Sequence, residues 1–107
     1  MSKSSTTTDD DLLPNPHPGE ILKDEFLDPM GVSIYAAAKA IGVSRSQLNG
    51  ICRGEHRITA PIALRLGKYL GVDPRWFMNM QAKYDLDTSS EELEDVLKSI
   101  EPIRTAA

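Results

Sequence analysis

The sequence predicts an all-α fold: a five-helix DNA-binding domain followed by one short C-terminal amphipathic helix. Apolar residues recur at helical spacing, glycine or proline separates these repeats, and no stretch alternates like a half-buried strand. The 107 residues suffice for one small domain with tails. We expect a disordered N-terminal tail over 1–15, a helical domain over 16–86, and an acidic C-terminal tail with a short helix over 87–107.

The first predicted helix covers about residues 19–27. Its apolar side consists of Ile21, Leu22 and Phe26. Pro29 disfavours helical backbone in the residue before it, Asp28, so we expect it to end the helix. His17, just before the helix, and His56, in a later loop, have no neighbouring cysteine or histidine. We therefore expect both to be solvated or to face phosphate rather than to bind a metal ion.

Residues 33–53 predict two short helices joined by a tight turn. The first has one apolar face, formed by Ile34, Ala37, Ala38 and Ile41. Gly42 supplies the positive φ that ends it, and Ser44 with Gln47 forms a capping box that starts the second. The buried face of the second helix comprises Leu48, Ile51 and Cys52. This is the helix-turn-helix pattern, whose second helix enters the DNA major groove.

Three further helices are expected. Thr59 caps a fourth helix that ends at Gly71, and its core face consists of Ile62, Ala63, Leu66 and Leu70. Asp73 and Pro74 start a fifth, which reaches about Tyr84. Ser89 and Glu92 form another capping box before an apolar face of Leu93, Val96, Leu97 and Ile100. This last helix either folds back on its own domain or docks on another chain.

The outer face of the second helix-turn-helix helix favours DNA binding over a plain solvated surface. It contains no carboxylate, and its residues are Ser44, Arg45, Ser46, Asn49, Gly50 and Arg53. A merely solvated face would usually include acidic residues. Arginine and asparagine can make paired hydrogen bonds to guanine and adenine edges.

Individual DNA roles follow from this placement. Expected to read bases are Arg45, Ser46, Asn49 and, unless the capping box engages its side chain, Gln47. Expected to contact phosphates are Ser33, Tyr35, Lys39, Ser44, Arg53, His56, Arg57 and Thr59. A single helix-turn-helix grips little DNA, so we expect a homodimer on a palindromic site. The candidates for dimer contacts are Trp76 and Phe77, and ordinary core packing is their alternative role.

Charge is distributed unevenly along the chain. The net charge is −4, but residues 31–75 carry seven basic against two acidic residues, a balance of +5. Residues 1–30 have a balance of −5 and residues 76–107 one of −4. A basic centre with acidic flanks suggests two partners of opposite charge, one of them DNA.

Several classes of function are disfavoured. The single cysteine excludes an intrachain disulfide and fits a reducing compartment, and we expect Cys52 to be a small core residue. No apolar run suits a signal peptide or membrane span, so we expect a cytoplasmic protein without membrane contact. No cofactor or metal site and no catalytic residue is expected, because no phosphate-binding glycine loop, ligand cluster or nucleophile–base pair is present; an enzyme is improbable.

Four blocks of the sequence together resemble the HigA family of antitoxins, within the lambda-repressor-like (Xre) group. The blocks are HPGEILKDEF (17–26), AIGVSRSQLNGICRG (40–54), ITAPIALRLGKYLG (58–71) and DPRWFMNMQAKYDL (73–86). The resemblance implies a dimeric repressor of its own operon and a cognate basic toxin that cleaves mRNA on the ribosome, of the RelE-like class. Two alternatives remain: a regulator without a toxin, and a protein-interaction module that has lost DNA binding.

Overall fold

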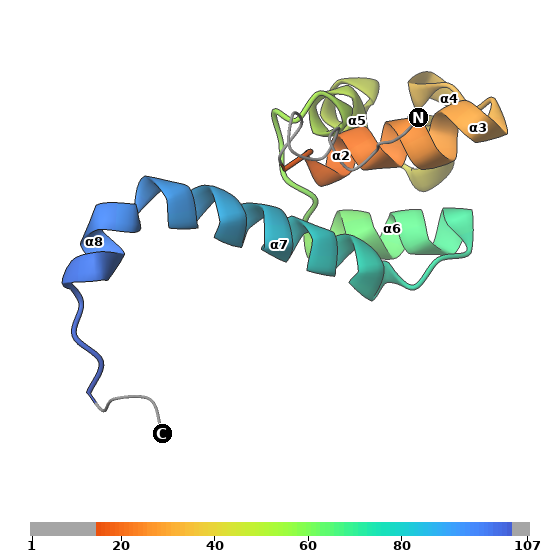
Figure 1. Ribbon diagram of the computed structural model, residues 1–107. Helices are drawn as coiled ribbons and strands as arrows, with labels where there is room; N and C mark the ends of the chain where they lie inside the picture. The colour runs from red at the N-terminus through yellow and green to blue at the C-terminus, as the bar shows by residue number, and fades with distance from the viewer. Residues whose placement is uncertain (1–14, 104–107) are drawn as a thin grey trace, which may run out of the picture.

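The computed structural model describes residues 15–103, and these residues form helices and connecting turns without a strand (Figure 1). The helical segments are α2 (Pro18–Leu22), the π-helical turn η1 (Lys23–Leu27), α3 (Asp28–Met30), α4 (Ile34–Ile41), α5 (Arg45–Cys52), α6 (Ala60–Leu70), α7 (Pro74–Glu92) and α8 (Glu94–Ser99). The predicted all-α class is therefore confirmed. The disordered tail expected over 1–15 lies, except for residue 15, outside the described residues.

The first helix is longer than expected. α2, η1 and α3 follow one another without interruption from Pro18 to Met30, so the prediction that Pro29 ends the helix is wrong. Pro29 falls in the first turn of α3, directly after the wider π turn, where its missing N–H is tolerated. The helix ends instead at Gly31, whose φ of 69° is left-handed.

The helix-turn-helix forms as the sequence predicts. Ser33 Oγ accepts a hydrogen bond from the Ala36 N–H (3.0 Å), and Ser44 Oγ accepts one from the Gln47 N–H (3.0 Å). Gly42 ends α4 with a φ of 77°. A contact not anticipated from the sequence closes the turn: Arg65 Nη1 of α6 donates to the Ile41 carbonyl (2.6 Å). This bond satisfies one of the carbonyl groups exposed at the end of α4.

The core lies between the helix-turn-helix, the first helix and α6. It contains Leu22, Leu27, Ala37, Ala38, Ile41, Leu48, Ile51, Cys52, Ile58, Ile62, Ala63, Leu66 and Phe77. The predicted core role of Cys52 is confirmed, and burial raises the pKa of its thiol to about 11. Such a thiol stays protonated and unreactive at neutral pH.

The C-terminal half of the chain differs from the prediction. α7 runs through Tyr84 and across the expected boundary at 86/87 to Glu92, so the helix end at Tyr84 and the cap at Ser89 are wrong. No glycine or proline lies between Pro74 and Pro102 to stop the helix. The helix breaks only at Leu93 (φ −102°, ψ 15°), where α8 begins. α7 thereby carries α8 away from the body of the domain, and α8 does not fold back on it (Figure 1).

In residues 15–103, no helix combines the length and apolar character needed to cross a bilayer.

Candidate nucleic-acid interface

Three helices of the domain begin at short hydroxyl residues. α4, α5 and α6 have Ser33, Ser44 and Thr59 at their N-caps, and none has an acidic residue in its first turn. Thr59 occupies the predicted N-cap position of α6, but its hydroxyl makes no capping hydrogen bond. Helix N-termini without acidic neighbours present N–H groups and a positive dipole end that favour phosphate.

The first turns of α5 form an exposed polar ridge. Arg45, Ser46 and Gln47 are exposed and Asn49 is half-buried, as expected for side chains that read bases. Within residues 15–103, Arg45 forms no ion pair, and the Gln47 side chain makes no hydrogen bond back to the cap. Both side chains are therefore available to a ligand.

Gly50 does not lie on the outer face as predicted, because it is buried. A Cβ atom at this position would lie 2.2 Å from Cδ2 of His56. The imidazole ring of His56 therefore packs over α5 at this glycine, while much of it remains exposed. Only glycine lets the loop after α5 approach the helix so closely.

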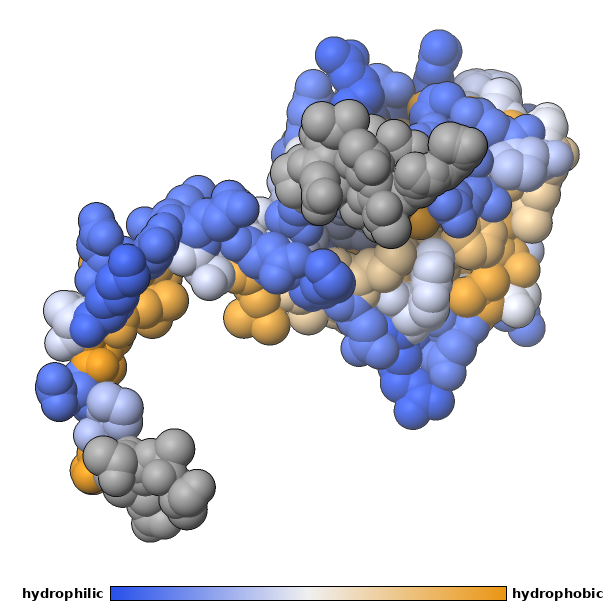
Figure 2. All heavy atoms as spheres, in the orientation of Figure 1, coloured by the Kyte–Doolittle hydropathy of each residue, from blue (hydrophilic) through white to orange (hydrophobic). Residues whose placement is uncertain are grey.

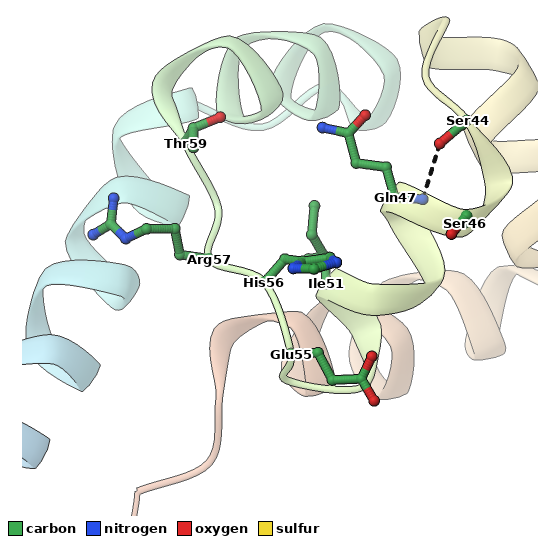
Figure 3. A pocket seen from close by; sticks show the side chains of 8 residues that line it. All are labelled: Ser44, Ser46, Gln47, Ile51, Glu55, His56, Arg57 and Thr59. Atoms are coloured by element: carbon green, nitrogen blue, oxygen red, sulfur yellow. Dashed lines mark hydrogen bonds between the residues drawn. The ribbon is translucent and has the colours of Figure 1, made fainter.

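Two surface hollows flank the ridge. One, shown in Figure 3, is lined by Ser44, Ser46, Gln47, Ile51, Glu55, His56, Arg57 and Thr59. The other is lined by Lys23, Leu27, Asp28, Val32, Ser33, Ile34, Tyr35, Arg45 and Asn49. The α5 ridge thus stands between Ser33 and Tyr35 on one side and Arg57 and Thr59 on the other. A helix entering a major groove needs this arrangement, because a phosphate strand runs along each side of it.

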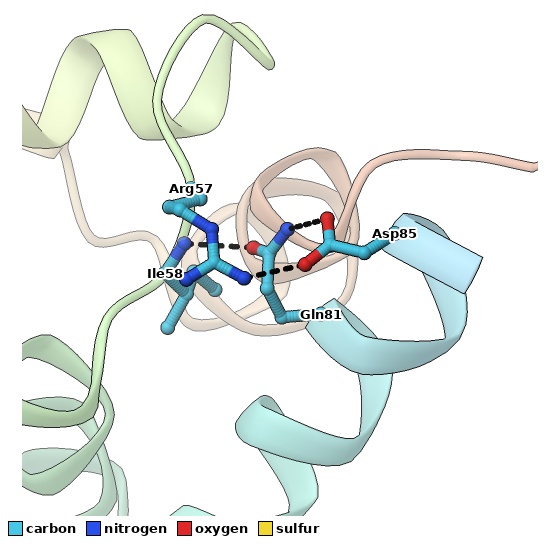
Figure 4. Close-up of polar contacts among 4 residues, drawn as sticks. All are labelled: Arg57, Ile58, Gln81 and Asp85. Carbon is cyan, nitrogen blue, oxygen red and sulfur yellow. Dashed lines mark hydrogen bonds and ion pairs between the residues drawn. The ribbon is translucent and has the colours of Figure 1, made fainter. Parts of the chain in front are cut away.

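Arg57 already has an acidic partner within the domain. Its guanidinium forms an ion pair with Asp85 of α7 (Figure 4). Gln81 completes the group: its Oε1 accepts from the Ile58 N–H (2.7 Å), and its Nε2 donates to Asp85 (3.0 Å). Partial burial alone would raise the pKa of Asp85, but the hydrogen bonds from Arg57 and Gln81 lower it. α7 therefore holds the loop between α5 and α6 in place, and its Asp85 neutralises the charge of Arg57.

Two predicted phosphate contacts lie outside both hollows. Lys39 is exposed on α4, and Arg53, at the end of α5, pairs with Glu55 at 3.5 Å. Among the described residues, no cluster of histidine, cysteine or carboxylate side chains could hold a metal ion.

Comparison with known proteins shows which family the chain belongs to. A profile of the helix-turn-helix family matches residues 24–77. Virulence-associated protein I of Dichelobacter nodosus is 45% identical over 95 residues (89% of this chain, 87% of the relative), and antitoxin HigA-1 of Vibrio cholerae is 36% identical over 85 residues (79% and 80%). The structure of Pseudomonas aeruginosa antitoxin HigA with the higBA promoter superimposes with a TM-score of 0.81 at 38% identity, covering 84% of this chain and 99% of that one.

The chain belongs to the HigA family of antitoxins. This confirms the family resemblance drawn from the sequence and places the chain among helix-turn-helix transcription regulators that bind DNA.

Of the two candidates for dimer contacts in this HigA-family chain, one takes the alternative role, ordinary core packing. Phe77 is completely buried and belongs to the core, which is the alternative role predicted for it. Trp76 is 39% exposed and packs edge-on against Phe26, with ring centroids 5.3 Å apart, so it remains a candidate.

His17 is buried rather than solvated. Its Nδ1 accepts from the Gly19 N–H (2.9 Å), and Glu20 Oε1 accepts from the His17 N–H (3.2 Å), which completes a capping box. The ring also contacts Tyr84 of α7 edge-on, at a centroid distance of 4.8 Å. Burial lowers the pKa of His17, and Glu20 and Asp85 partly oppose that shift.

The sequence reasoning missed the residues of α7 that hold the DNA side of this HigA-family domain. Gln81 and Asp85 are four residues apart, the spacing that places two polar side chains on one helix face. That spacing was the available signal, but their partners lie in a loop more than twenty residues earlier.

Proposed function

We propose that this HigA-family chain binds a palindromic operator as a homodimer, represses its own operon, and neutralises a basic RelE-like toxin that cleaves mRNA. One observation supports DNA binding: a carboxylate-free α5 ridge stands between two hollows, and the N-terminus of another helix lines each hollow. The promoter bound in the Pseudomonas aeruginosa HigA structure supports the same role for this domain.

We assign base reading to Arg45, Ser46, Gln47 and Asn49, because they form the exposed part of the ridge. Phosphate contacts come from the rims of the hollows, chiefly Ser33, Tyr35, Ser44 and Thr59, with His56 beside them. Arg57 contributes only when its pair with Asp85 opens. Lys39 and Arg53 add long-range attraction at the edge of the surface.

The DNA assignment is tested by fluorescence anisotropy on a duplex from upstream of the gene and on a scrambled duplex. Arg45→Ala should lose about 1–3 kcal/mol on the upstream duplex, roughly 5- to 150-fold, and little on the scrambled one. Lys39→Ala should weaken both duplexes alike and reduce the salt slope. Lys83→Ala is the control, because Lys83 pairs with Asp87 on α7. Normal upstream binding by Arg45→Ala would contradict the assignment.

The toxin part rests on family membership and on the acidic ends of the chain, which complement a basic partner. The test is co-expression with a small basic reading frame next to this gene, followed by affinity capture and a growth assay. Capture together with restored growth supports an antitoxin. A chain that binds its operator but captures no neighbour is a regulator without a toxin. A chain that binds no duplex at micromolar concentration is an interaction module.

A further inference from the structure

Lys23 is a cation beside the α5 ridge that the sequence did not single out. It stands at the start of η1 and lines the same hollow as Ser33, Arg45 and Asn49. Its Nζ donates to both carboxylate oxygens of Asp28, at 3.2 Å and 3.0 Å, and Asp28 lines that hollow too. In the DNA complex of the proposed function, this hollow follows the phosphate strand on the α4 side of the ridge.

The π turn creates this ion pair. Lys23 and Asp28 are five residues apart, and in an α-helix such residues point about 140° apart around the helix axis. η1 instead closes the hydrogen bond of a π-helix, from the Asp28 N–H to the Lys23 carbonyl, so the two residues lie one turn apart on one face. Single π turns inside α-helices are frequent at functional sites. This wider turn therefore places a carboxylate beside a cation on the DNA side of the domain.

Both side chains of the pair remain in contact with water. The exposed fraction is 42% for the Lys23 side chain and 54% for that of Asp28. Figure 2 shows hydrophilic side chains along the upper edge of the domain, where α5 lies in Figure 1. An exposed ion pair stabilises a fold very little, so the amine can leave Asp28 for another anion at small cost. A DNA phosphate is a favourable acceptor, because a bound cation releases counterions from the duplex.

The hollow on the other side of the α5 ridge has a similar arrangement of charges. Arg57 lines it and pairs with Asp85 of α7. Each of the two phosphate strands beside the ridge would therefore meet one cation that a carboxylate of the same chain already holds. The pairs involve separate elements, η1 with α3 on one side and the loop after α5 with α7 on the other. In both, a carboxylate restrains a cation that a phosphate could bind.

We propose that Lys23 is a phosphate-binding residue of the DNA interface and that Asp28 competes with DNA for it. The inference rests on the DNA binding of the proposed function and adds a contact on its α4 side. When the α5 ridge enters the major groove, the Lys23 amine moves from Asp28 to a phosphate oxygen. The carboxylate of Asp28 stays beside the strand and opposes binding. Asp28 therefore lowers the affinity for every duplex, because phosphate contacts do not read bases.

The first test measures the salt dependence of binding by fluorescence anisotropy on the upstream and scrambled duplexes. Asp28→Asn keeps an oxygen that accepts from the Lys23 amine but removes the competing charge. The slope of log affinity against log salt should steepen by about 0.9 on both duplexes. The ratio of variant to wild-type affinity should then fall by about 3.5-fold between about 50 and 200 mM salt.

Two further variants isolate the cation. Asp24→Asn is the matched control: it removes the same charge from the next residue after Lys23, and Asp24 forms no ion pair with a residue of the described range 15–103. It should leave the slope unchanged. Lys23→Gln, added to Asp28→Asn, should abolish the extra slope. The side chains at these positions are partly or fully exposed, so the helical circular dichroism of the variants should match that of the wild type.

The second test observes the Lys23 amine directly. The wild-type protein is acetylated with an N-hydroxysuccinimide ester, with and without the upstream duplex, and the modification of each lysine is quantified by mass spectrometry. The duplex should reduce the acetylation of Lys23. Lys83 is the reference, because it lies on α7 outside both hollows, and its acetylation should be the same with and without the duplex.

The possible outcomes separate the inference from the proposed function. Equal slopes for Asp28→Asn and Asp24→Asn overturn the competition, and an unprotected Lys23 overturns the contact. In both cases, binding of the upstream duplex by the wild type leaves the DNA function standing. An extra slope that persists after Lys23→Gln shows that lost repulsion causes it, which also overturns the contact. A wild type that binds no duplex overturns the proposed DNA function itself.

Discussion

Asp85→Asn is expected to strengthen DNA binding, although the residue lies on α7 and not on the DNA-reading helix. In the structure, its carboxylate pairs with Arg57 in the loop after α5. Asparagine keeps an oxygen that accepts from the Gln81 amide but removes the charge that holds Arg57. The loop therefore keeps its support at Ile58, where Gln81 accepts the N–H, while the guanidinium becomes available to a phosphate.

The magnitude follows from counterion release. One additional phosphate contact steepens the slope of log affinity against log salt by about 0.9. Between about 50 and 200 mM salt, the ratio of variant to wild-type affinity should then fall by about 3.5-fold, with the larger advantage at low salt. The gain is sequence-independent, because phosphate contacts do not read bases.

Fluorescence anisotropy with a labelled duplex across this salt range measures both quantities. Asp87→Asn is the control: it makes the same change in net charge on α7, but its partner is Lys83 (2.7 Å), which lies outside both hollows. The reasoning is refuted if Asp85→Asn and Asp87→Asn have equal slopes, because Arg57 then reaches no phosphate.

Two further predictions concern stability. Gly19→Ala should lower the unfolding free energy by about 1–3 kcal/mol, because the new Cβ would lie 1.7 Å from the Ile51 carbonyl oxygen. The cost of this clash exceeds the gain of about 1 kcal/mol in helix propensity. Thermal unfolding should show a melting temperature lower by several degrees, about 4–8 °C per kcal/mol. His17→Asn should reduce the loss of folding stability on acidification. Burial lowers the pKa of His17 below 6.5, so the unfolded chain binds the proton more readily than the folded chain. The stability of the wild type therefore falls as the pH falls through and below 6.5.

Each stability prediction has its own check. Ser90→Ala, at an exposed position of α7, should change the unfolding free energy by no more than about 0.5 kcal/mol. A Gly19→Ala protein as stable as the wild type would mean that α2 and α5 can separate without cost. For His17, thermal melts from neutral pH to about pH 5 are compared, and identical pH profiles would show that other groups cause the acid sensitivity.

Local sequence patterns predicted the helix-turn-helix well. Ser33, Gly42 and Ser44 act within four residues of the groups they satisfy, so their roles depend little on the rest of the fold. The spacing of Leu48, Ile51 and Cys52 likewise predicted the buried side of α5 correctly. The exposure of Arg45 followed directly, because it lies on the opposite side of the same helix.

The same patterns failed where a local signal competed with its surroundings. Pro29 and the Ser89–Glu92 pair predict helix boundaries, yet the chain remains helical through both. A preceding π turn accommodates the proline, and nothing near Ser89 breaks the helix. His17 was expected in solvent because the sequence does not show that Tyr84 will lie against its ring.

The sequence by itself therefore determined the helical class, the capped helix-turn-helix and the basic, carboxylate-free face of α5, because these depend on residues a few positions apart. Only the tertiary structure decided that Asp85 forms an ion pair with Arg57, that Gln81 accepts the Ile58 N–H, and that α7 holds α8 away from the domain. These features join residues more than twenty positions apart or depend on the direction of one long helix, and helical periodicity carries no information about either.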